Sequence, residues 1–431
     1  MENLPIEVVG NILSQLGSAR DVMVASATCK KWRDACTRHL RVLSFDSSDW
    51  AGYRALTIDS CTCLEIIITQ TIFQTSSLQS LSIIMDGISD EFLAAPVIAW
   101  LMYTRETLRS LIYTVPTTPT FNILEKLGRQ KLEVLELAHN SIIGVEPSYQ
   151  RFPSLVSLSL SNVSISALDL NLLLTACPKI EDLVLVRLDI HMSDTHATLE
   201  LCSPTLKSIL IQTTSSLDKF ILEADTLETF HLKDSSLEQF ELIGKGTLKN
   251  IIIDDVSFIH LDIGETDNLE IVDLSRFTLP WPKFHQLISR SSKLRKLRLW
   301  GMVFDDEDEI VNLETVAMCF PKLKHFALSC DMRDGLLHYG LQGSAQLENV
   351  TVLELGWVVI GEHFCHWVEG VLDRCPNVKK LVVHGFVFDI KTQEECQMLA
   401  NFTSDIVRLM RRYMHLDVQF KYTNEISGLS H

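Results

Sequence analysis

The chain has 431 residues, 46% of them hydrophobic, and a formal net charge of −17. A chain of this length can bury a large core, as two or three domains or as one long repeat array. The acidic balance argues against a nucleic-acid-binding protein, because affinity for a phosphate backbone comes mostly from basic side chains.

Two further features of the composition predict where the protein resides. The apolar runs are too short to span a membrane, and Glu2 and Glu7 stand where a secretion signal has basic residues. The eleven cysteines are scattered singly and form no C-x-x-C pair, which indicates reduced thiols. We therefore expect neither secretion nor membrane attachment, and a location in the cytoplasm, the nucleus or both.

The first 41 residues predict three short helices. Pro5 suits a first helical turn and Gly17 follows the last periodic residue, so a helix is expected over 5–16, followed by helices near 21–27 and 29–37. The apolar residues of the first helix spread over roughly 160° of its surface, wider than the stripe of about 100° that one buried face needs. Either the following chain covers the excess, as it would over an N-terminal cap, or a partner protein does.

From residue 78 onward one pattern recurs, apolar-x-x-apolar-x-apolar. Its last two apolar residues lie two apart and point to the same face of a strand, into a core, while the residues flanking them point outward. This is the strand signature of a leucine-rich repeat, in which parallel strands stack and bury a continuous apolar ladder. The copies begin at residues 78, 108, 132, 155, 180, 206, 227, 248, 269, 294, 323, 350 and 378.

The spacing of the copies predicts what lies between them. Steps of 23 to 26 residues from 108 to 206, and of 25 to 29 residues from 269 to 378, leave room for a return helix in each repeat. Between 206 and 269 each step is 21 residues, and second copies of the pattern begin at 217, 237 and 258. We expect two strands and no helix in each of these central repeats. The clearest helix candidates are 94–104, 167–178, 363–376 and a final 392–414, the last followed by a strand over 418–422.

The residue after the strand pattern is asparagine in one copy alone, Asn140. The hydrogen bonds of the turns that follow the strands must therefore come from other groups than a ladder of asparagine side chains.

The N-terminal segment resembles an F-box. L-P-x-E from Leu4 to Glu7, I-L-S-x-L over 12–16, Asp21 and C-K-x-W-R over 29–33 match the F-box pattern in order and spacing. With the repeats, and with C-P-x-I/V before the strand pattern at Cys177 and Cys375, the whole chain is similar to plant-type F-box/leucine-rich-repeat proteins. The implied fold is α/β, with a three-helix F-box over 1–41, a repeat solenoid over 42–390 and a capping helix and strand over 391–431.

The resemblance also implies a function. Such proteins are substrate receptors of SCF (Skp–cullin–F-box) ubiquitin ligases, which dock on a Skp-type adaptor, through it on a cullin, and capture a target protein for degradation. An F-box scaffold or small-ligand co-receptor that does not direct degradation is the alternative. The positions that make the apolar adaptor contact in that family correspond to Leu4, Pro5, Ile12, Leu13, Leu16 and Trp32.

Catalytic and metal-binding motifs are weak by comparison. His363 and His366 have a spacing that can chelate zinc, and the acidic run over 305–309 lacks the glycine and the distant glutamate of a calcium loop. We interpret both as solvent-facing helix residues. No nucleophile motif and no Gly-rich phosphate loop occurs, so we expect a non-catalytic protein without metal or cofactor.

A target site is expected on the outward strand positions, which form one continuous surface. Arg298 and Trp300 occupy adjacent outward positions, and such pairs are typical of binding hot spots. One hypothesis is that this surface contacts an acidic segment of the target or a small anionic ligand. The other is that Arg298 pairs with Asp273 on the neighbouring strand and Trp300 caps a turn. The candidate contact residues are Lys296, Arg298, Trp300, His325 and Trp357.

Overall fold

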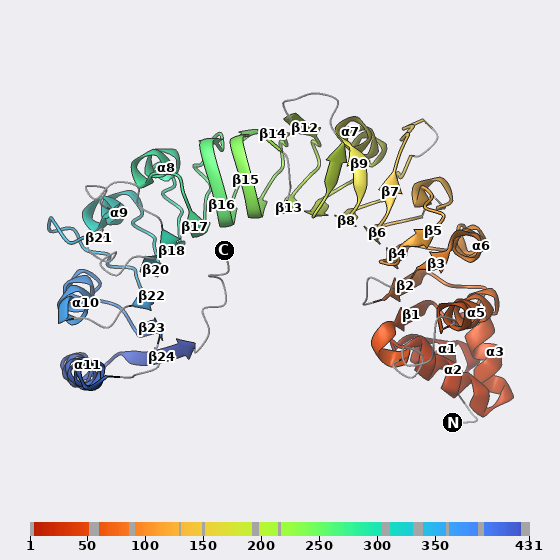
Figure 1. The fold of residues 1–431 in the computed structure, drawn as a ribbon, viewed down its shortest axis with the longest axis horizontal. Coiled ribbons are helices and arrows are strands. Elements are labelled where there is room, and N and C mark those ends of the chain that lie inside the picture. Colours follow the sequence, from red (N-terminus) through yellow and green to blue (C-terminus); the bar gives the residue numbers. More distant parts are fainter. Residues whose placement is uncertain are drawn as a thin grey trace. The chain divides into compact units, whose positions relative to one another are not determined.

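The computed structural model of the chain forms two compact units, Met1–Ala224 and Asp225–His431, which are described one at a time below (Figure 1). The residues whose structure is described are 4–50, 60–85, 91–128, 131–148, 151–191, 198–213, 217–302, 311–330, 339–358, 362–386 and 392–423.

The first unit begins with the three predicted helices, α1 Ile6–Ser14, α2 Ala19–Thr28 and α3 Lys30–His39. Pro5 caps α1, and Gly17 ends the turn after it at φ +78°, a conformation that glycine adopts without a steric cost. Gly10 faces the backbone of His39, and a β-carbon at position 10 would collide with it. The close packing of α1 on α3 therefore depends on a glycine in the middle of α1.

A parallel sheet follows the helices in the first unit. Each strand pairs with the next one in the list, and its inward residues, such as Leu43, Leu81 and Leu111, are fully or almost fully buried. This confirms the apolar ladder predicted from the repeat pattern and adds one strand, β1, ahead of the copy at residue 78. The strands are β1 Val42–Asp46, β2 Ser80–Ile84, β4 Ser110–Tyr113, β6 Val134–Ala138, β8 Ser157–Ser161, β10 Asp182–Val186 and β13 Ser208–Gln212.

Helices and short strands complete the repeats of the first unit. Helix α6 coincides with the predicted 94–104, and α7 lies within the predicted 167–178, with the Ser166 hydroxyl accepting a hydrogen bond from the Asp169 N–H at its start. The helices are α5 Ser60–Phe73, α6 Ala94–Thr104 and α7 Ala167–Ala176, with 3-10 turns η1 Ser47–Trp50 and η2 Ile123–Glu125. The short strands are β3 Phe92–Leu93 with β5 Thr117–Thr118, β9 Ser164–Ser166 between β7 Ser141–Ile142 and β11 Asp189–His191, and β12 Thr198–Cys202 with β14 Lys219–Glu223.

The expectation of a return helix in every step from 108 to 206 is wrong for three of these steps. Among the described residues, the 3-10 turn η2 is the only helical segment in the step after β4, the step after β6 holds no helix, and the step after β10 holds strand β12. Pro116, Pro119, Gly144 and Pro147 interrupt the first two segments, and proline within a helix removes a hydrogen bond and clashes with the preceding turn. The third segment alternates apolar and polar residues over 198–202, which favours a strand.

The second unit contains a parallel sheet of eight described strands, each paired with the next in the order given. In Figure 1 its helices lie along one side of these strands. The strands are β15 Thr229–Ile243, β16 Asn250–Asp262, β17 Ile271–Phe277, β18 Lys296–Met302, β20 His325–Cys330, β22 Val352–Val358, β23 Lys380–Phe386 and β24 Asp417–Thr423, with a separate pair β19 Val311–Asn312 and β21 Tyr339–Gly340. The helices are α8 Trp281–Ile288, α9 Leu313–Cys319, α10 Glu362–Arg374 and α11 Gln393–Arg412.

Two strands per repeat replace a helix at the start of the second unit, as the 21-residue spacing predicts. β15 and β16 pair over 229–233 with 250–254 and, past a bend, again over 235–241 with 256–262. Aromatic side chains fill the space that a helix would otherwise cover: the rings of Phe230 and Phe240 stack at 4.5 Å, and Phe258 contacts Phe240 and Phe277 at 6.4 and 6.0 Å. The predicted end of the chain is also present, as α11 and β24.

The turn after each strand is made by the backbone. The residue seven positions after the start of the pattern has a positive φ in eight successive repeats: His139, Asn162, Arg187, Thr213, Asp234, Asp255, Arg276 and Gly301. In three repeats of the first unit, the backbone N–H of this residue donates a hydrogen bond to a carbonyl of the next repeat. The bonds run from His139 to Ser161, from Asn162 to Val186 and from Arg187 to Gln212, with N···O distances of 2.8 to 3.1 Å. These backbone bonds supply the turn hydrogen bonding that an asparagine ladder would provide.

Candidate functional site

An apolar stripe lies exposed on the first helix. Val8, Ile12 and Leu16 follow one another at intervals of four residues along α1 and the turn after it, so they line one helix face. Their exposed fractions are 39%, 38% and 40%, although Val9, the residue after Val8, is buried. The described part of the chain thus leaves this stripe open to solvent. The helix therefore has apolar surface that the described residues do not cover, as the width of its apolar arc predicts.

The residues predicted to contact an adaptor fall into three groups. Pro5, Ile12 and Leu16 are exposed. Leu4 and Trp32 are half-buried at the margin of the unit. Leu13 is fully buried, so the structure places it in the core of the three-helix unit and not on the stripe. The sequence pattern did not single out Val8, whose spacing from Ile12 could have identified it.

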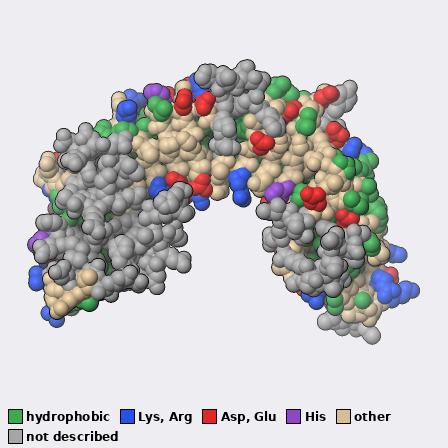
Figure 2. All heavy atoms as spheres, viewed as in Figure 1, with side chains coloured by type: hydrophobic (Ala, Val, Ile, Leu, Met, Phe, Trp, Pro, Cys, Tyr) green, Lys and Arg blue, Asp and Glu red, His purple; other side chains and the backbone are tan. Residues whose placement is uncertain are grey.

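The third helix of the same unit carries exposed basic side chains. Lys30, Arg33 and Arg38 of α3 are exposed, and Figure 2 shows Lys and Arg side chains gathered over this helix. The three-helix unit therefore offers both an apolar stripe and positive charge, although the chain as a whole is acidic. A partner with an apolar groove and an acidic surface would complement both features.

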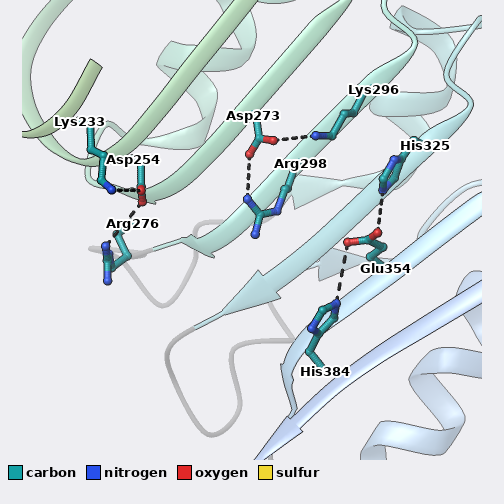
Figure 3. A network of polar contacts seen from close by, with 9 residues as sticks. All are labelled: Lys233, Asp254, Asp273, Arg276, Lys296, Arg298, His325, Glu354 and His384. Carbon is teal, nitrogen blue, oxygen red and sulfur yellow. Dashed lines mark hydrogen bonds and ion pairs between the residues drawn. The ribbon is translucent and has the colours of Figure 1, made fainter. Parts of the chain in front are cut away.

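A second candidate site is the outward face of the strands in the second unit. Here each of three carboxylates lies between two bases contributed by other strands or turns (Figure 3). Asp254 lies 3.9 Å from Lys233 and 3.5 Å from Arg276, and Asp273 lies 2.7 Å from Lys296 and 3.0 Å from Arg298. Arg276 also contacts Asp255 at 3.2 Å, which balances the charges of the first group.

The third carboxylate, Glu354 on β22, lies between two histidines. Its oxygens are 3.3 Å from Nε2 of His325 on β20 and 3.9 Å from Nε2 of His384 on β23. The hydrogen bond from His325, helped by the charges of His325, His384 and Lys421, lowers the pKa of Glu354 to about 2. Burial lowers the pKa of His384, while Glu354 opposes this change. Glu354 is thus held ionised beside two imidazoles.

Trp300 connects the second and third carboxylate groups. Its ring lies 4.5 Å from the guanidinium carbon of Arg298 and 4.9 Å, edge to face, from the ring of His384. Only 7% of Trp300 is exposed, and Ala327 and Ser329 on the intervening strand β20 are fully buried. The small residues of β20 leave room for the indole to lie across this strand, where it contacts both Arg298 and His384.

Four of the predicted target residues, Lys296, Arg298, Trp300 and His325, thus lie on neighbouring strands β18 and β20, and the second sequence hypothesis is correct in one of its two parts. Arg298 does pair with Asp273, and Trp300 is a buried platform, where the hypotheses made it an exposed contact or a turn cap. Trp357 lies in β22, but its side chain is outside the described residues. The sequence analysis did not select Glu354 and His384, although both occupy outward positions of the same strand pattern.

Other chemistry is sparse in the part of the chain that is described. Within it no group of three or more His, Cys, Asp or Glu side chains is arranged to hold a metal ion, and no helix is long and apolar enough to cross a membrane. The side chains of His363 and Cys365 and the whole acidic run 305–309 fall outside the described residues. Burial raises the pKa of the Cys177 and Cys375 thiols to about 12, so both remain protonated near neutral pH.

Fold and exposed stripe together define a leucine-rich-repeat protein with an N-terminal F-box. Residues 1–42 match the F-box-like family model, and residues 105–247 match the repeats of the FBD-associated F-box protein At5g56370. The F-box/LRR-repeat protein At1g67190 of Arabidopsis thaliana is 64% identical over 423 residues, covering 98% of this chain and all of that protein. The F-box protein At1g10780 of the same plant is 26% identical over 194 residues, 43% of this chain and 44% of that protein. The chain belongs to the F-box/LRR-repeat proteins.

Two general properties come with this family. An F-box generally binds a Skp-type adaptor, and F-box/LRR proteins are generally non-catalytic.

Proposed function

We propose that the protein is the substrate-recognition subunit of an SCF ubiquitin ligase. In this proposal the F-box docks on a Skp-type adaptor, the adaptor connects the protein to a cullin, and the repeats capture a target protein. The observation that carries the proposal is the exposed stripe of Val8, Ile12 and Leu16, which the described residues leave uncovered at the position where the family binds its adaptor.

The energetics favour burial of this stripe in a complex. Covering apolar surface contributes about 25 cal/mol per Å², so three aliphatic side chains that are each more than one third exposed represent a gain of roughly 1–3 kcal/mol. Lys30, Arg33 and Arg38 on α3 of the same unit would attract an acidic adaptor and speed its association. The residues that we propose contact the adaptor are Leu4, Pro5, Val8, Ile12, Leu16 and Trp32.

The target contact belongs, in the same proposal, to the outward face of the strands in the second unit. Lys296, Arg298 and His325 lie on this face, and Trp300 supports Arg298. The role needs no catalytic residue in this chain, because other subunits transfer ubiquitin. A location in the cytoplasm or nucleus follows from the same role.

Co-elution tests the proposal. The purified chain and a Skp-type adaptor are expected to elute together on size exclusion, and addition of the cullin is expected to shift the peak further. Absence of a shared peak with folded protein would overturn the receptor role. Reconstitution with ubiquitin then separates a receptor from a scaffold, because a scaffold binds the adaptor without its partner becoming modified.

A further inference from the structure

The paired bases on the strand face are held in fixed positions by the carboxylates between them. Lys296 and Arg298 both contact Asp273, whose side chain is only 15% exposed, while their own side chains are 31% and 30% exposed. A base that is already ordered loses less side-chain entropy when it binds an anion. Asp273 therefore orders two cations that remain accessible from solvent.

The charges in this group do not cancel. One carboxylate faces two permanent cations, which leaves one positive charge beside Trp300. Arg298 uses Nη1 for Asp273, and a guanidinium has five N–H donors, so donors remain for a second anion. The contact with the indole restricts the guanidinium, and a guanidinium held in place can recognise a carboxylate or phosphate through two parallel hydrogen bonds.

A second basic position also adjoins Trp300. The ring of His384 on β23 packs perpendicular to the indole, and His384 is the register partner of Lys421 on β24, which is exposed. The Trp300 indole contacts both Arg298, at 4.5 Å, and His384, at 4.9 Å, so the two basic positions adjoin the same ring.

We propose that these two positions, Lys296 with Arg298 and His384 with Lys421, bind an acidic segment of a polypeptide that carries at least two carboxylate or phosphate groups. One anionic group contacts the guanidinium and ammonium beside Asp273, and the other contacts the imidazole and Lys421. The proposal rests on the proposed function in one respect only, that the segment belongs to the captured target.

Histidine makes this binding depend on pH. His384 faces Glu354 on β22, Lys421 on β24, and Arg298 and Trp300 on β18, while His325 faces Glu354 and has Lys296 as its register partner. Burial keeps His384 neutral at pH 7, and a bound anion favours its protonated form. Binding of the acidic segment therefore takes up a proton and tightens as the pH falls below the ordinary histidine pKa of 6.5.

Fluorescence anisotropy with the full chain tests the proposal. The probe is a labelled short peptide of alternating Glu and Gly, with matched peptides carrying phosphoserine or Gln in place of Glu. Lys296→Gln with Arg298→Gln is the test variant. Lys283→Gln with Arg290→Gln is the control, because it removes the same two charges from exposed positions on or beside α8 of the same unit.

We expect the Glu or the phosphoserine peptide to bind, the Gln peptide not to bind, and the test variant to weaken binding at least about tenfold while the control changes it less than about twofold. Comparison of the Glu and phosphoserine peptides identifies the preferred anion. The Glu peptide should bind about threefold or more tightly at about pH 5.5 than at about pH 7.5, and His384→Gln should remove most of this difference.

Several results would overturn the proposal: no binding of either acidic peptide, equal weakening by test and control variants, or pH dependence that survives His384→Gln. Co-elution of each variant with the Skp-type adaptor is measured in parallel. If the wild-type chain binds the adaptor but neither acidic peptide, the acidic-segment site alone is refuted, whereas peptide binding by a wild-type chain that does not bind the adaptor refutes the receptor role alone.

Discussion

The indole of Trp300 on β18 lies against Gly356 on β22, with strand β20 between them, and leaves no room for a β-carbon at position 356. A ring that spans two strand intervals needs small residues beneath it, and Ala327 and Ser329 provide them. The conformation of Arg298 and His384, which both contact this ring, therefore depends on a glycine two repeats away.

Gly356→Ala is expected to lower the free energy of unfolding by about 1–3 kcal/mol, because the added methyl group displaces the indole. Chemical denaturation of the wild type and the variant measures the difference. Trp300→Leu provides the matched test: in its background the glycine substitution should cost less than about 0.5 kcal/mol, since the ring that it would displace is gone. Equal costs in both backgrounds would show that Gly356 is needed for another reason.

The Glu354 carboxylate should stabilise the fold over a defined pH range. Its folded-state pKa, about 2, lies below the ordinary value of 4.5, so the stabilisation is complete above 4.5 and is lost as the pH falls toward 2. The contribution is up to about 3 kcal/mol at about 1.4 kcal/mol per pKa unit.

Urea unfolding of wild type and Glu354→Gln at several pH values measures this contribution. The difference between the two proteins should be largest near about pH 5 and shrink as the pH approaches 2.5. A difference that stays constant over this range would mean that Glu354 acts through packing and not through its charge.

The positive φ at the turn after each strand should cost most where the residue is β-branched. Thr213 has φ 51°, a conformation that a branched side chain rarely adopts. Thr213→Asn is expected to raise the free energy of unfolding by about 1 kcal/mol, since asparagine tolerates left-handed backbone. The same substitution at Thr198, within strand β12, serves as the control and should not stabilise. Loss of stability in Thr213→Asn would show that the threonine side chain makes a contact worth more than the strain.

The repeat pattern predicted most of the fold because its period of two within strands and its spacing between strands both reflect burial. Strands at all thirteen copies, the helices α6, α7 and α10, and the two-strand repeats after residue 227 are present. Strand β1 was missed although residues 40–45, LRVLSF, are a copy of the pattern, because this copy directly follows the third helix and stands far ahead of the regular series that begins at residue 78. The absent helices were missed because spacing alone shows room for a helix, whereas proline and alternating residues decide whether one forms.

The candidate sites were harder to predict because they depend on registration between strands. Asp273 and Arg298 lie 25 residues apart in sequence and become neighbours only when the two strands pair in register. Aligning the outward positions of successive copies does predict that pair. The same alignment does not predict that the Trp300 side chain lies across β20, because the conformation of a side chain depends on the size of the residues that it packs against.

Calorimetric titration of a Skp-type adaptor into the full chain is the most direct test of the proposed function. The test variant carries Val8→Ser, Ile12→Ser and Leu16→Ser, and the control carries Leu168→Ser, which removes an equally apolar side chain that is 68% exposed on α7. The wild type and the control should bind with the same affinity, and the test variant should bind at least about tenfold more weakly while circular dichroism shows it folded. Docking through the exposed stripe of α1 would be contradicted if all three proteins bound the adaptor equally well, or if none of them bound it.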